Sequence, residues 1–72
     1  MNSTIKNDPA MDMLKIFLQN SNERNEMTDE GKKLLNASFG RVSSERRGFV
    51  YQEFTGLLYD RGIKVDQQQF AY

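Results

Sequence analysis

The 72-residue chain contains no cysteine, no histidine and no tryptophan, and only one proline. Without cysteine the chain forms no disulfide, and without cysteine and histidine it lacks the ligands of ordinary zinc sites. The same two absences remove the imidazole base and the thiolate nucleophile from any catalytic arrangement. The five glycines do not fall into a phosphate-binding pattern. We therefore expect no enzymatic activity, no cofactor and no metal.

An excess of charge of one sign and long apolar runs are also missing. Ten basic and ten acidic residues give a formal net charge of zero, whereas nucleic-acid-binding domains are usually basic. No window approaches the roughly 18 apolar residues of a membrane span, and the N-terminal residues lack the apolar core of a signal peptide. We expect a cytoplasmic protein without a membrane partner.

The length of the chain limits it to one small domain. We expect residues 1–72 to form this domain, with flexible ends at 1–7 and 66–72. A chain this short buries only about 60% of the surface that its unfolded form exposes, so its core is marginal. Such proteins usually gain support from disulfides, a metal or a second subunit. With the first two excluded, a homo-oligomer or a partner protein remains.

The sequence predicts an all-α fold of three helices, at about 9–20, 28–39 and 44–61. Asp8 followed by Pro9 is a typical helix start, and Thr28 is a typical N-cap. Ser43 or Ser44 is expected to cap the third helix. Gly62 is expected to end that helix in the left-handed conformation of a Schellman motif, with Ile63 packed on the preceding turn.

Apolar residues recur at helical spacing in all three segments. The stretch 43–63 is the richest in them, and we expect it to be the principal helix on which two shorter helices pack. An alternative places residues 46–50 in a loop or short strand, because Phe49, Val50 and Tyr51 favour strands and Gly48 weakens a helix. The predicted core positions are Ala10, Met13, Leu14, Phe17, Leu18, Leu34, Leu35, Phe39, Val42, Val50, Tyr51, Phe54, Leu57 and Leu58.

Several apolar and aromatic residues lie outside these core stripes, and protein interfaces are enriched in aromatics and methionine. We therefore predict a small non-enzymatic protein, an inhibitor or adaptor, that binds and modulates a partner protein, alone or as a homodimer. Small asparagine-rich, cysteine-free chains are also typical of phage and plasmid accessory proteins. The candidate partner-binding residues are Met11, Ile16, Phe49, Tyr59, Phe70 and Tyr72.

Basic residues between the second and third predicted helices support an alternative function. A helix-turn-helix regulator would place the third helix in the major groove of DNA and use nearby cations on the phosphates. A solvated charge cluster at a helix start explains the same residues. The candidate contacts to phosphates or to an acidic partner are Arg41, Arg46, Arg47, Lys32 and Lys33.

The segment from Thr28 to Leu58 resembles an EF-hand, since Phe39 ends one helix and Glu53-Phe54 begins the apolar part of the next. It does not match the standard calcium loop, but residues 40–53 resemble the longer loop of pseudo-EF-hands. The resemblance implies a degenerate, calcium-responsive module. The three arginines of this segment oppose that interpretation because they would repel a divalent cation.

Overall fold

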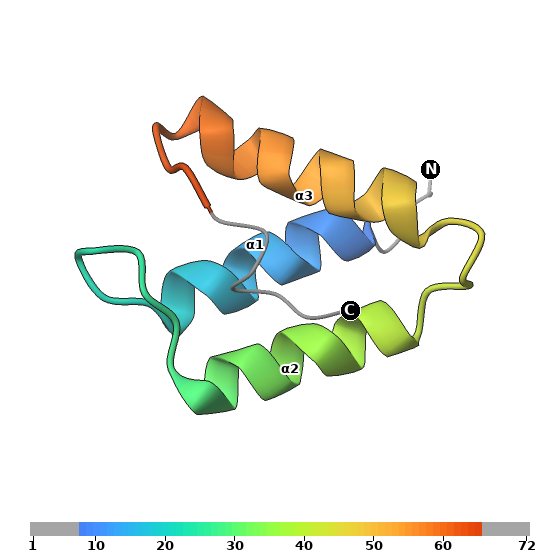
Figure 1. Ribbon diagram of the computed structural model, residues 1–72, viewed down its shortest axis with the longest axis horizontal. Helices are drawn as coiled ribbons and strands as arrows, with labels where there is room; N and C mark the ends of the chain where they lie inside the picture. Colours follow the sequence, from blue (N-terminus) through green and yellow to red (C-terminus); the bar gives the residue numbers. More distant parts are fainter. Residues whose placement is uncertain (1–7, 66–72) are drawn as a thin grey trace, which may run out of the picture.

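The computed structural model describes residues 8–65, which form three helices (Figure 1). Helix α1 spans Pro9–Gln19, α2 spans Asp29–Gly40 and α3 spans Arg47–Asp60. Residues 8–65 contain no strand, so the predicted all-α three-helix fold is confirmed. The segments 1–7 and 66–72, for which we predicted flexibility, lie outside the described residues.

Side chains cap the first two helices where the sequence predicts it. The Asp8 carboxylate accepts a hydrogen bond from the amide of Ala10 at 3.1 Å, and Pro9 occupies the first turn of α1. The Thr28 hydroxyl accepts one from the amide of Gly31 at 3.0 Å. Each cap satisfies an amide that has no partner within its own helix.

The end of α3 is the Schellman motif that the sequence predicts. Gly62 has a φ of 80°, a left-handed conformation that glycine adopts without steric cost. The amide of Gly62 donates to the carbonyl of Tyr59 at 2.8 Å, and the amide of Ile63 donates to that of Leu58 at 2.9 Å. Ile63 is half-buried against the core, so the chain turns back along α3 after residue 62.

The start of α3 differs from the prediction. Neither Ser43 nor Ser44 caps it, because the helix begins only at Arg47 and its N-cap residue, Arg46, makes no side-chain cap bond. Residues 47–50 are helical, so the alternative of a loop or strand there is wrong. The apolar residues at 49–51 form a helix because α1 and α2 supply a surface for Val50 and Tyr51 to pack on, which outweighs their strand preference.

Helix α1 is the central helix, which corrects the expectation that residues 43–63 hold this place. Both α2 and α3 pack against α1 (Figure 1). Ala10, Met13 and Phe17 of α1 are each 0% exposed. The ring of Phe17 meets that of Phe54 of α3 edge to face, with 6.4 Å between centroids. The first helix therefore lies between the other two, and it contributes as many buried apolar residues as the longer α3.

The core contains the residues that the helical spacing predicts, with three exceptions, of which Leu57 of α3 is only partly buried against the core. Leu18 of α1 is 41% exposed and Leu34 of α2 is 47% exposed, so their predicted burial is wrong. Each lies at the edge of its apolar stripe, where a three-helix arrangement offers no further layer to cover it. The buried apolar residues are Ala10, Met13, Leu14, Phe17, Met27, Leu35, Phe39, Val42, Val50, Tyr51, Phe54 and Leu58.

The connection between α1 and α2 is an ordered loop built on asparagine side chains. The Asn22 carboxamide oxygen accepts hydrogen bonds from the amides of Arg24 and Glu26, at 2.9 and 3.0 Å. Asn25 has a φ of 64°, a left-handed conformation that asparagine tolerates better than most residues. Local hydrogen bonds therefore hold the tip of this loop closed, and Met27 near its end packs into the core.

The first turn of α2 lies directly against the end of α1, and Gly31 makes this possible. Gly31 is buried, and a Cβ atom at this position would collide with the Cβ of Asn20 and come within 3.0 Å of the Met27 side chain. Asn20 is itself fixed, because its side chain donates to the carbonyl of Ile16 at 2.8 Å. Its carbonyl accepts from the amide of Thr28 at 2.8 Å. The missing side chain at position 31 thus sets how closely the two helices approach.

We expect Gly31→Ala to lower the free energy of unfolding by about 1–3 kcal/mol, because overpacking at a fixed contact costs this much. Gly40→Ala in the same helix is the control. A Cβ there meets nothing within 4 Å, so this variant should match the parent or gain up to about 1 kcal/mol. Urea unfolding of both variants checks this expectation, and equal midpoints would contradict it.

Candidate functional site

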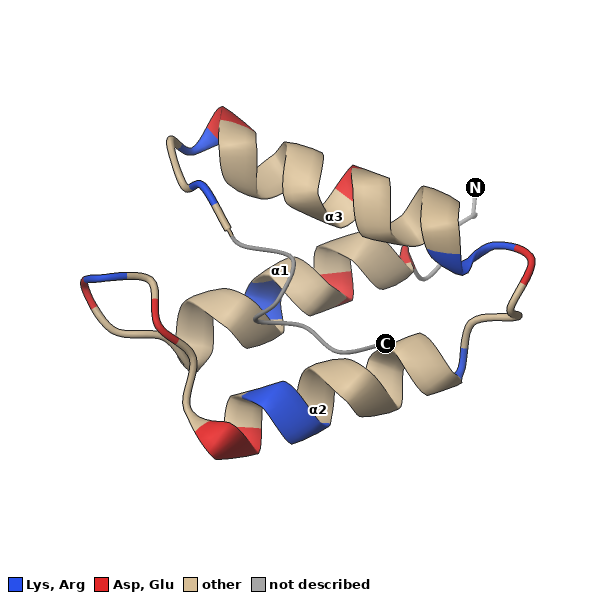
Figure 2. Cartoon of the chain, viewed as in Figure 1, with Lys and Arg blue, Asp and Glu red and all other residues tan. Residues whose placement is uncertain are grey.

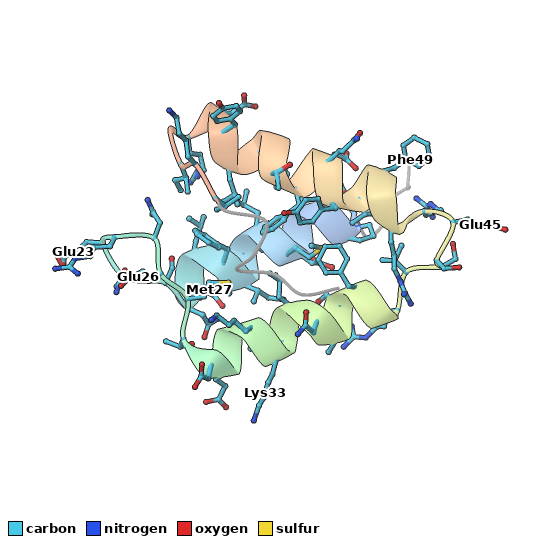
Figure 3. All side chains as sticks on the ribbon, viewed as in Figure 1. Glu23, Glu26, Met27, Lys33, Glu45 and Phe49 are labelled. Atoms are coloured by element: carbon cyan, nitrogen blue, oxygen red, sulfur yellow. The ribbon has the colours of Figure 1, made fainter. Side chains whose placement is uncertain are left out.

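The outward side of α3 carries the most exposed aromatic residues of the described chain. Phe49 is 74% exposed and Tyr59 is 65% exposed, whereas the opposite side of α3 is buried. Figure 3 shows Phe49 pointing away from the helices. We call this surface the outer face of α3; its members, all exposed, are Phe49, Gln52, Glu53, Gly56 and Tyr59.

A groove of about 490 Å³ runs along α3 beside the outer face. The chain that turns back at Gly62 forms one wall with Ile63 and Val65, both half-buried against the core. Lys64 is the only charged residue among those that line the groove. The lining consists of Tyr51, Gln52, Thr55, Gly56, Tyr59, Ile63, Lys64 and Val65.

Two small residues, Thr55 and Gly56, line part of the groove. A Cβ atom at Gly56 would meet nothing within 4 Å, so the helix backbone is open to an approaching group. The hydroxyl of Thr55 donates to the carbonyl of Gln52 at 3.1 Å. The exposed ring of Tyr59 lies beside Thr55 and Gly56 in the lining of the groove. The result is a hollow beside an aromatic ring, a shape that suits an apolar side chain from another molecule.

The side chains of the outer face and of the groove offer aromatic rings, an amide, hydroxyl groups, a carboxylate and an ammonium group. Among residues 8–65 no group of three or more acidic, histidine or cysteine side chains lies together as metal ligands would. No helix in the same range has the length and apolarity needed to cross a bilayer.

No protein family, curated protein or solved structure matches the chain. The function must therefore be argued from the outer face of α3 and its surroundings.

The predicted partner-binding residues are divided among several parts of the molecule. Phe49 and Tyr59 share the outer face of α3. Met11 is 40% exposed on α1, and Ile16 of α1 is half-buried against the core. Phe70 and Tyr72 lie outside the described residues.

The sequence-based search missed three contributors to this surface, Gly56, Ile63 and Val65. The helical spacing already placed Gln52 and Tyr59 on the side opposite the core. Gly56 lies between them on that side, so the sequence alone could have identified it as a position without a side chain. The contribution of Ile63 and Val65 was not detectable, because it depends on the path of the chain after Gly62. That path follows from packing on the core rather than from any local signal.

The predicted basic residues do not form one cluster (Figure 2). Lys32 and Lys33 lie in the first half of α2, whereas Arg41 and Arg46 lie in the connection beyond its other end. At about 1.5 Å of helix rise per residue, Lys32 and Arg41 are roughly 13 Å apart along the axis. Arg47 is half-buried, and its Nε donates to the carbonyls of Phe39 and Val42.

The arrangement of residues 40–53 also differs from the EF-hand that the segment resembles. Gly40 is the last residue of α2, and α3 begins at Arg47. The connection is therefore residues 41–46, and residues 47–53 are helical instead of belonging to a calcium loop. Glu53 lies on the outer face of α3.

The bonds of Arg47, at 3.1 Å to the Phe39 carbonyl and 3.0 Å to the Val42 carbonyl, join the start of α3 to the end of α2. A cation at a helix C-terminus is also attracted by the partial negative charge of the last carbonyls, which stabilises the helix. The side chain of Arg47 therefore replaces the missing cap as the feature that orients α3.

We expect Arg47→Ala to lower the free energy of unfolding by about 1–3 kcal/mol, because hydrogen bonds to charged groups contribute this much. Arg46→Ala is the matched control, since its side chain is exposed, and its thermal midpoint should equal that of the parent. Thermal unfolding followed by circular dichroism measures both. Equal destabilisation by the two substitutions would show that Arg47 acts only as a surface charge.

Proposed function

We propose that the chain is a non-enzymatic protein that binds a partner protein through the outer face of α3 and the adjoining groove. The observation that carries this proposal is the exposure of Phe49 and Tyr59 on one side of one helix. Folding buries the other side of α3 and leaves these two rings outside the core. They are therefore available to a partner without any rearrangement of the helices.

The energetics of the two rings support a binding role. Burying an aromatic side chain of this size contributes about 2 kcal/mol, and tyrosine is frequent among the residues that dominate interface energies. The surface therefore has two projecting rings, Phe49 and Tyr59, and a groove beside them. A partner that covers both rings and fills the hollow gains apolar contact, and the rim of Gln52, Glu53 and Lys64 offers polar contacts.

A protein of this size can modulate a partner by binding it, without a catalytic site. The chain's interior is filled by core side chains, and the described surface carries the groove along α3 and a smaller pocket of about 280 Å³ beside Pro9 and Arg41. By covering a partner's surface, such a protein acts as an inhibitor, and by joining two surfaces it acts as an adaptor. The separation of Lys32 and Lys33 from Arg41 and Arg46 gives no specific support to the alternative of DNA binding.

Replacing both rings should remove partner binding and leave the fold intact. We expect Phe49→Ser with Tyr59→Ser to reduce recovery of the partner from source-cell extract by at least tenfold, because about 4 kcal/mol of burial is lost. Leu34→Ser is the control, since it removes an exposed apolar residue from α2 instead. Affinity purification with quantitative mass spectrometry measures recovery, and circular dichroism verifies folding. Equal recovery with both variants would contradict the proposal.

A further inference from the structure

We draw no further inference here: the strongest candidate, the groove between α3 and the returning chain at residues 63–65, belongs to the site already described, and nothing among the described residues shows which molecule covers it.

Discussion

The contact between Gly31 and Asn20 is the constraint on which the arrangement of the helices depends. A chain without cysteine must fix the angle between its first two helices by packing and hydrogen bonds. The absent side chain at position 31 lets α2 start against the end of α1, and the bond from the Thr28 amide to the Asn20 carbonyl fixes that start. Phe39 and Leu35 then reach the core from α2, and together with α1 they form the surface that α3 covers.

Helix α3 is held at both ends, and this determines which of its sides remains outside. At its start Arg47 binds the carbonyls of Phe39 and Val42, and at its end the Schellman turn returns Ile63 to the core. Between these points the rings of Phe39 and Tyr51 meet, with 5.9 Å between centroids. With both ends fixed, α3 cannot rotate to bury Phe49 without removing Tyr51 from the core.

The sequence was sufficient for the features that depend on neighbouring residues and insufficient for those that depend on distant ones. The caps of α1 and α2 and the turn at Gly62 involve residues within a few positions, so their signals are local. Gly31 was not identified as a contact point, because its neighbour Asn20 lies in another element. The predicted caps at Ser43 and Ser44 are wrong because α3 begins only at Arg47, whose side chain binds carbonyls at the end of α2 and just after it. The aromatic side chains of the outer face were predicted as binding residues, but the groove beside them required the fold.

The outer face of α3 has features that neither the core nor the caps require. An isolated exposed apolar residue is normal in a folded protein, so Phe49 alone would carry little weight. Gly56 lies about two turns from Phe49 in the interior of the same helix, and a Cβ there would meet nothing within 4 Å, as is also true of Gly40 and Gly48 near their helix ends. Removing the ring would cost the monomer no buried contact, and replacing the glycine with alanine would stabilise its helix. The proposed contact with a partner protein is a setting in which the exposed Phe49 ring would contribute favourably.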